Sequence, residues 1–187
     1  MRLFNVLTAA AVALSVGACA SMSPAEKSSK QAEVRQATQK SLQKFYKADP
    51  SLQSAVAMAP GYGIFTTYGL SFIIGGAGGS GIVHNSSTKA DTFMETAQAS
   101  AGLQAGAAQT DTLIVFKTAE AMNTFVEKGW VTGVGGGAQA GAKGDSVGPG
   151  GVEQGIASAK YYTLTPNGLQ AGIAGSGIKF WKSKDLN

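Results

Sequence analysis

Residues 61–81 read GYGIFTTYGLSFIIGGAGGSG, a stretch in which glycine is mixed with short apolar runs. The chain has 187 residues and 26 glycines, and Gly17 is the only glycine before residue 61. Glycine normally weakens a β-strand, but it is tolerated where another backbone packs close or where the strand bends sharply. The glycine content from residue 61 onward therefore predicts a tightly coiled antiparallel sheet.

The pattern Gly-x-Gln-Ala-Gly occurs three times further along the chain, at residues 102–106, 137–141 and 168–172. Because side chains alternate between the two faces of a strand, each copy would place Gly and Gln on one face and its apolar residues on the other. The copies begin 35 and then 31 residues apart, a spacing too uneven for a solenoid. We interpret them as strands of one sheet.

Residues 30–48 predict an amphipathic helix. The larger apolar residues, which share one broad face of a helical wheel, are Val34, Leu42, Phe45 and Tyr46. The basic residues on the opposite face are Lys40, Lys44 and Lys47. Two interpretations stay open: a core-packing helix with solvated lysines, or a helix whose lysines contact a membrane.

Two shorter helices follow from local signals. Asp49 and Pro50 look like an N-cap and a first helical residue, which predicts a short helix as far as Ala59. Residues 112–116, TLIVF, predict a buried strand, and Thr118 can then cap a helix over residues 118–128. The inward-facing residues of that helix are Met122, Phe125 and Val126, and Gly129 ends it.

The first 18 residues predict a secretory signal peptide. After Arg2, an apolar run of about 14 residues ends at Val16, whereas a membrane-spanning helix needs about 20. The run closes with Val16-Gly17-Ala18-Cys19, which is similar to the lipobox of bacterial lipoproteins. We expect cleavage before Cys19 and acylation of this cysteine, with palmitate among its lipids. The alternative is an ordinary secretory peptide followed by a chance cysteine.

This processing predicts three parts: a signal peptide (1–18), a lipidated tether (19–29) and one domain (30–187). Loss of Arg2 lowers the formal net charge from +4 to +3, too weak a charge to indicate nucleic-acid binding. The predicted location is the cell envelope. In a Gram-negative host, Ala20 after the cysteine predicts the periplasmic face of the outer membrane.

Two short motifs resemble enzyme signatures but lack the required context. Residues 76–81 fit the dinucleotide pattern Gly-x-Gly-x-x-Gly, yet a strand-like segment follows where a helix must open. Residues 144–148 fit the hydrolase pattern Gly-x-Ser-x-Gly, yet Pro149 and two glycines follow, and they do not start a helix readily. Neither motif predicts a catalytic site.

The remaining candidates for chemistry are few. His84 is the only histidine and we interpret it as a turn residue, while Asp111 precedes a buried strand and is expected to bond nearby backbone. One histidine and one lipidated cysteine cannot build a histidine-rich or thiolate zinc site. We therefore predict no catalytic residue, metal or cofactor.

Residues 178–184, IKFWKSK, form a second basic cluster. Its candidate membrane contacts are Lys179, Trp181, Lys182 and Lys184. Tryptophan favours the headgroup zone because its ring is apolar and its N–H needs a polar partner. In a strand, Lys179 and Trp181 would share one face, with Phe180 and Lys182 on the other. The competing interpretation is that one aromatic fills the core and the lysines keep an edge strand soluble.

Successive blocks of this chain resemble the SYLF domain family. In order they are residues 61–65, 75–81, 101–106, 111–116 with Phe125, 130–134, and finally 168–169 with 172–173. The resemblance covers roughly residues 52–186. Thr66 and Thr67 depart from it, because many members have proline after the equivalent of Phe65.

The resemblance implies lipid binding, with no established catalytic set; eukaryotic members are associated with phosphoinositide membranes and, in fungi, with actin. We therefore expect an α+β fold: a coiled, glycine-rich antiparallel β-sheet flanked by helices. The expected partners are membrane lipids, including anionic phospholipids. The alternative function is a structural or protein-interaction module of the envelope.

Overall fold

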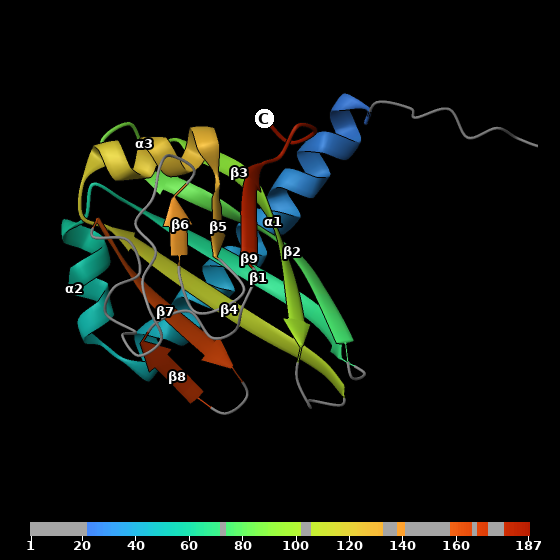
Figure 1. Ribbon diagram of the computed structural model, residues 1–187. Coiled ribbons are helices and arrows are strands. Elements are labelled where there is room, and N and C mark those ends of the chain that lie inside the picture. The colour runs from blue at the N-terminus through green and yellow to red at the C-terminus, as the bar shows by residue number, and fades with distance from the viewer. Residues whose placement is uncertain are drawn as a thin grey trace, which may run out of the picture.

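The computed structural model describes residues 22–71, 74–101, 106–132, 138–140, 158–165, 168–171 and 178–187. The predicted signal peptide, Cys19 and residues 144–148 lie outside these ranges. Within them, helices and antiparallel strands build an α+β domain, as predicted (Figure 1).

The sheet of the described residues has nine strands in the order β6-β5-β9-β3-β2-β1-β4-β7-β8. The strands are β1 (Gly61–Ser71), β2 (Ile74–Asn85), β3 (Asp91–Ala101), β4 (Gly106–Phe116), β5 (Trp130–Thr132), β6 (Ala138–Ala140), β7 (Ala159–Thr165), β8 (Gly168–Ala171) and β9 (Ile178–Lys182). Every pairing is antiparallel. In Figure 1, β5, β6 and β9 run steeply across the direction of β1, β4 and β7, so the sheet is strongly coiled.

Glycine is required where β1 and β2 approach each other. A Cβ added to Gly81 would lie 2.8 Å from the Cα of Phe65, and one added to Gly79 would lie 2.8 Å from the Cα of Thr67. Cβ atoms do not approach other backbone atoms this closely, so these positions exclude any larger residue. The glycine-rich stretch thus forms a strand, and no helix opens after residues 76–81.

All three Gly-x-Gln-Ala-Gly copies fall at least partly within the described residues, and the described parts are strands, as predicted. The second and third copies contribute β6 and β8, which are the two ends of the strand order, and Gly106 of the first copy begins β4. Residues 102–105 of the first copy lie outside the described ranges.

Both faces of the sheet bury apolar side chains, because neighbouring residues of one strand point to opposite sides. The α1-side core consists of Val34, Phe45, Leu52, Val56, Ala59, Ile64, Ile82, Phe93, Leu113, Val115 and Leu186. The α3-side core consists of Phe65, Val83, Met94, Ile114, Phe116, Met122, Phe125, Ala159, Tyr161, Ile178 and Phe180. Residues 112–116 are all buried for this reason, which confirms the predicted strand.

Helix α1 (Pro24–Ala48) begins six residues earlier than the predicted start at residue 30. The Ser23 side chain accepts a hydrogen bond from the Glu26 backbone N–H, while the Glu26 carboxylate accepts one from the Ser23 backbone N–H at 2.8 Å. This capping box starts a helix where composition alone suggested a tether. The prediction of a tether over residues 19–29 is therefore wrong from Pro24 onward.

The buried face of α1 is less apolar than predicted. Val34 and Phe45 are buried, but the positions between them on the same face are Thr38 and Ser41. The Thr38 hydroxyl donates to the Val34 carbonyl at 3.0 Å, so it needs no partner on the sheet. Leu42 and Tyr46 pack partly buried against the α1-side core.

The two shorter helices match their predictions closely. Helix α2 (Ser51–Met58) begins one residue later than predicted, with Pro50 and not Asp49 as its N-cap, and the Asp49 carboxylate accepts the Ser51 backbone N–H at 2.9 Å. Helix α3 (Ala119–Lys128) is capped by Thr118 and ends at Gly129, which has φ +64. A residue with a Cβ rarely adopts that φ, so glycine fits this end of the helix.

Candidate functional site

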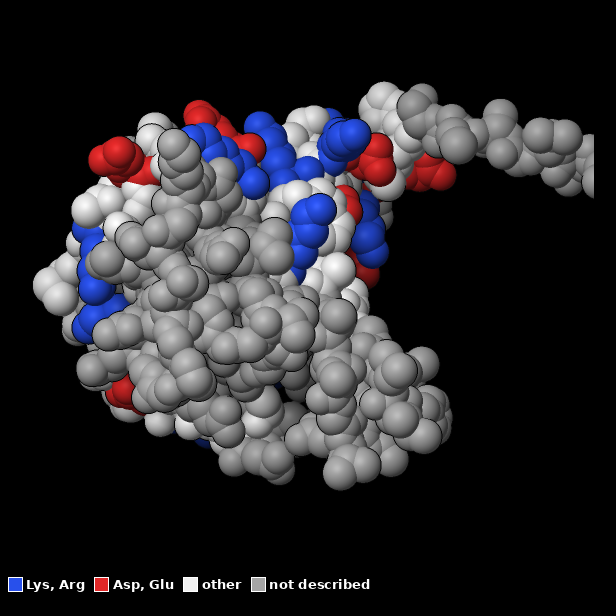
Figure 2. Space-filling view, in the orientation of Figure 1, with Lys and Arg blue, Asp and Glu red and all other residues white. Residues whose placement is uncertain are grey.

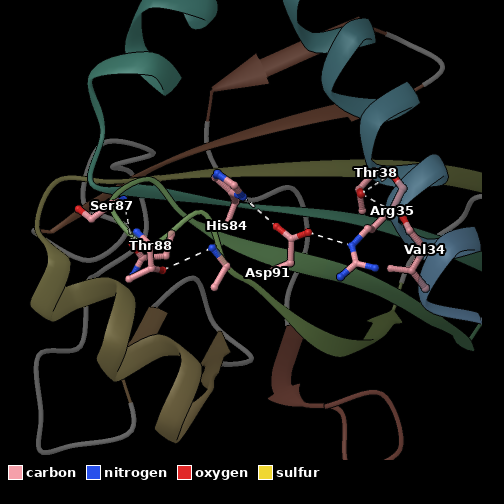
Figure 3. Close-up of polar contacts among 9 residues, drawn as sticks. Val34, Arg35, Thr38, His84, Ser87, Thr88 and Asp91 are labelled. Carbon is pink, nitrogen blue, oxygen red and sulfur yellow. Dashed lines mark hydrogen bonds and ion pairs between the residues drawn. The ribbon is translucent and has the colours of Figure 1, made fainter. Parts of the chain in front are cut away.

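A charged bridge joins α1 to the start of β3. The Asp91 carboxylate lies 3.0 Å from Arg35 Nε through one oxygen and 2.8 Å from His84 Nδ1 through the other (Figure 3). The Arg35 guanidinium also lies 4.8 Å from the centroid of the Phe93 ring. The three charged or titratable side chains therefore hold α1 on the sheet.

His84 is a strand residue within β2 and not a turn residue, so that interpretation was wrong. Its ring stacks obliquely on Tyr62, with 5.2 Å between centroids. Burial, and then the neighbouring Tyr46 and Asp91, raise the pKa of Tyr62. The hydrogen bond of His84 Nδ1 to Asp91 fixes the orientation of the ring.

A buried carboxylate on β4 forms a second polar centre. Asp111 is 3% exposed and accepts hydrogen bonds from Thr66 Oγ1 at 2.8 Å and from the Gln109 side-chain amide at 3.1 Å. Lys44 Nζ lies 2.9 Å from its other oxygen. The expectation that Asp111 bonds nearby backbone was wrong, because its partners are side chains from α1, β1 and β4. Lys44 accordingly differs from Lys40 and Lys47, since its charge is paired.

The C-terminal strand holds a third polar group. Trp181 Nε1 donates to Glu95 at 3.0 Å, and the Ser183 hydroxyl donates to the other Glu95 oxygen at 2.7 Å. Lys179 Nζ lies 5.9 Å from the Trp181 ring centroid. The half-buried indole is therefore fixed in place before any ligand binds.

Strand β9 pairs with β3 on one side and with β5 on the other. It is therefore an inner strand of the sheet, and the interpretation of residues 178–184 as an edge strand is wrong. Phe180 is buried in the α3-side core, and Lys179 is exposed on the opposite face, as the predicted alternation requires. Lys182 lies on the same side of β9 as Phe180, yet it is exposed because the strand ends at this residue.

On the face of the sheet that α1 crosses, strand pairing places residues of five neighbouring strands side by side in two rows. The polar row, one residue per strand, is Trp181, Glu95, Ser80, Thr66 and Asp111. The open row lies two residues away from the polar row on each strand and consists of Lys179, Ala97, Gly78, Tyr68 and Gln109. Tyr68 is 61% exposed, and no atom lies within 4 Å of a Cβ added to Gly78. Sequence reasoning missed both rows, since only strand pairing brings these residues together.

The two lysine clusters predicted from sequence do not meet. Gln31 Nε2 donates to the Leu186 carbonyl at 2.8 Å, so the C-terminal residues lie beside the first half of α1. Lys44 is 13 residues further along the helix, or about 20 Å at the usual rise per residue. Figure 2 shows Lys and Arg gathered, with Asp and Glu among them, over the end where α1 begins and the C-terminus lies.

The described residues contain neither a metal-binding cluster nor a membrane-spanning helix. No group of three or more His, Cys, Asp or Glu residues among them could hold a metal ion. No helix among them is long and apolar enough to cross a bilayer.

Residues 97–187 match the family model Ysc84, described as "Las17-binding protein actin regulator". This part of the chain is similar to Ysc84 (SYLF) domains. This confirms the family resemblance found in the sequence. A comparison with curated proteins gave no significant match. Strands β1 and β2 precede the matched residues, yet they pair between β3 and β4 and so complete the sheet of the SYLF domain.

Proposed function

We propose that this chain is a cell-envelope lipoprotein, anchored through Cys19, whose SYLF domain binds lipid at a membrane surface without catalysing a reaction. The family is lipid- or actin-related, and the lipobox-like sequence supplies a reason for the domain to be held at a bilayer. In a Gram-negative host the membrane would be the outer membrane, on its periplasmic face.

The proposal rests on the exposure of the lysines that the sequence singled out as membrane contacts, and on the lack of ion pairs between most of them and other described residues. Five of them are exposed and form no ion pair with a described residue: Lys40, Lys47, Lys179, Lys182 and Lys184. A lysine near an anionic membrane surface is worth about 1 kcal/mol, so several together give useful binding. Lys44 contributes less than the sequence suggested, because Asp111 already pairs with it.

Flotation of the unacylated chain beginning at Ala20 tests lipid binding by the domain itself. We expect it to float with vesicles that contain phosphatidylglycerol, to float less with pure phosphatidylcholine, and to lose binding as salt rises. Protein that stays at the bottom of the gradient with both vesicles would contradict the proposed lipid binding.

Labelling with radioactive palmitate tests the anchor. Cys19→Ser should abolish incorporation, since a hydroxyl is a much weaker nucleophile than a thiolate. Label that still enters the mutant would contradict acylation at Cys19.

A second candidate function is protein binding, which the description of the Ysc84 family favours. The open row offers a surface for it, with Tyr68 projecting beside the uncovered Gly78. An interaction module would need its acyl chains in order to float, whereas a lipid-binding domain would not, so the flotation experiment separates the two functions.

A further inference from the structure

We infer that the domain contacts the bilayer through one end, formed by the first turns of α1 and the turn that follows β9. The inference rests on the proposed anchoring at Cys19 and adds which surface meets the lipid headgroups. This surface, here named the anchor end, consists of residues 22–30 and 182–187.

The connector between the acylated cysteine and the fold is short. Cys19 and the capping residue Ser23 are four residues apart, and an extended chain spans at most about 3.5 Å per residue, or about 14 Å here. The helix cannot lengthen the connector without losing its capping box and the bond from the Lys27 backbone N–H to the Ser23 carbonyl at 2.9 Å. The start of α1 therefore stays close to the bilayer.

The turn after β9 is bound to that same start of α1. Lys27 Nζ donates to the Asn187 carbonyl at 2.6 Å, one helical turn before the contact from Gln31 to Leu186. The Asn187 side chain in turn bonds both backbone groups of Phe93, at 3.0 and 2.8 Å. These contacts span 94 to 160 residues of sequence, so the anchor end is one rigid surface that includes Lys182 and Lys184.

The chemistry of the anchor end suits phospholipid headgroups. Met22 is 40% exposed beside the connector, where an apolar side chain can enter the interface. The exposed cations of this surface are Lys30, Lys182 and Lys184, and its exposed acids are Glu26 and Asp185. Because the exposed lysines outnumber the exposed acids, the phosphate groups of lipid headgroups suit this surface.

The other cluster lies far from the anchor end. Lys40 and Lys47 are 16 and 23 residues beyond Pro24 on α1, or about 24 and 35 Å along its axis. Those distances exceed the roughly 8–10 Å over which exposed charges act at physiological salt. In Figure 1, α1 begins at the upper right, whereas β1 ends at the lower right. The bilayer that anchors the protein is therefore met by Lys184 and not by Lys47.

Fluorescence quenching on the full acylated chain in phosphatidylethanolamine–phosphatidylglycerol vesicles tests this orientation. Cys19 is the only cysteine, and acylation blocks its thiol, so Lys184→Cys and Lys47→Cys each give a single site for an environment-sensitive dye. Both positions are exposed lysines, which makes them matched controls for folding. A lipid with a nitroxide on its headgroup should quench the dye at position 184 several-fold more than the dye at position 47.

Equal quenching at the two positions, stronger quenching at position 47, or no quenching at either would overturn the orientation. Flotation of the same labelled samples distinguishes this failure from failure of the proposed function. A sample that floats but is not quenched at position 184 contradicts only the orientation. A sample that does not float contradicts the anchoring, and the orientation fails with it.

Discussion

The Nζ atom of Lys44 on α1 lies 2.9 Å from Oδ2 of Asp111 on β4, and the two residues are 67 positions apart in sequence. Thr66 and Gln109 donate to the same buried carboxylate. Helix α1 is thus held on the sheet by a charged contact at this point as well as by its apolar side chains. The lysine is half exposed and the aspartate is buried, so the two partners are not of equal importance for stability.

Replacement of Asp111 should destabilise the domain more than replacement of Lys44. Asp111→Ala leaves the Thr66 hydroxyl and the Gln109 amide without an acceptor, which costs about 1–3 kcal/mol. Lys44→Gln removes a partly solvated charge and should cost less than about 1 kcal/mol. Urea unfolding followed by circular dichroism measures both. A larger loss for Lys44→Gln would mean that the ion pair, and not the buried hydrogen bonds, is the main contribution.

The close approach of β1 and β2 predicts a contrast between two glycines of one strand. Gly81→Val should lower the free energy of unfolding by about 1–3 kcal/mol or more, because its side chain would overlap Phe65. Gly78→Ala should change it by no more than about 0.5 kcal/mol, since nothing lies near that position. Thermal unfolding of both variants checks the contrast. Equal melting temperatures would show that β1 does not pack against Gly81.

Tyr161 predicts how stability changes at alkaline pH. Burial raises the pKa of its hydroxyl well above the ordinary tyrosine value. The folded state therefore keeps a proton that the unfolded state loses above about pH 10. The stabilisation is complete below that pH and is lost as the pH rises toward the folded-state pKa.

The variant Tyr161→Phe isolates this contribution. Urea midpoints at about pH 8 and about pH 11 should fall less steeply with pH in the variant than in the parent chain. The comparison uses the slope because the variant also removes a buried polar group, which changes stability at every pH. Identical slopes would mean that Tyr161 titrates normally in the folded state.

Charge reversal separates the two lysine clusters as lipid contacts. Changing Lys179, Lys182 and Lys184 together to glutamate should leave the fold intact, because the three side chains are exposed. It should also remove most binding of the unacylated chain to anionic vesicles. The matched variant changes Lys40 and Lys47 to glutamate and omits Lys44, whose pairing with Asp111 would confuse the result. If neither variant loses binding in a flotation assay, both clusters are only solvated surface.

Local signals in the sequence predicted much of the secondary structure. Thr118 and Gly129 mark the two ends of α3, because a side-chain cap and a glycine with positive φ act within one or two turns of the helix. Residues 61–81 predicted glycine-rich strands for a similar reason, since only glycine allows the backbones of β1 and β2 to approach so closely. Ser23 and Glu26 form a capping box, which is a local signal for the start of α1. The polar composition of residues 21–29 nevertheless led to the prediction of a tether.

Contacts between distant segments were decided only by the tertiary structure. No local pattern links Asp111 with Lys44, or Glu95 with Trp181, because strand pairing and helix packing bring each pair together. The same holds for β9, which reads as an edge strand in sequence but pairs on both sides in the sheet. The amino-acid sequence by itself therefore determined most of the helices and strands and the resemblance to SYLF domains. Which charges are paired and which face solvent depended on the fold, since burial and distance are properties of packed segments and not of neighbours along the chain.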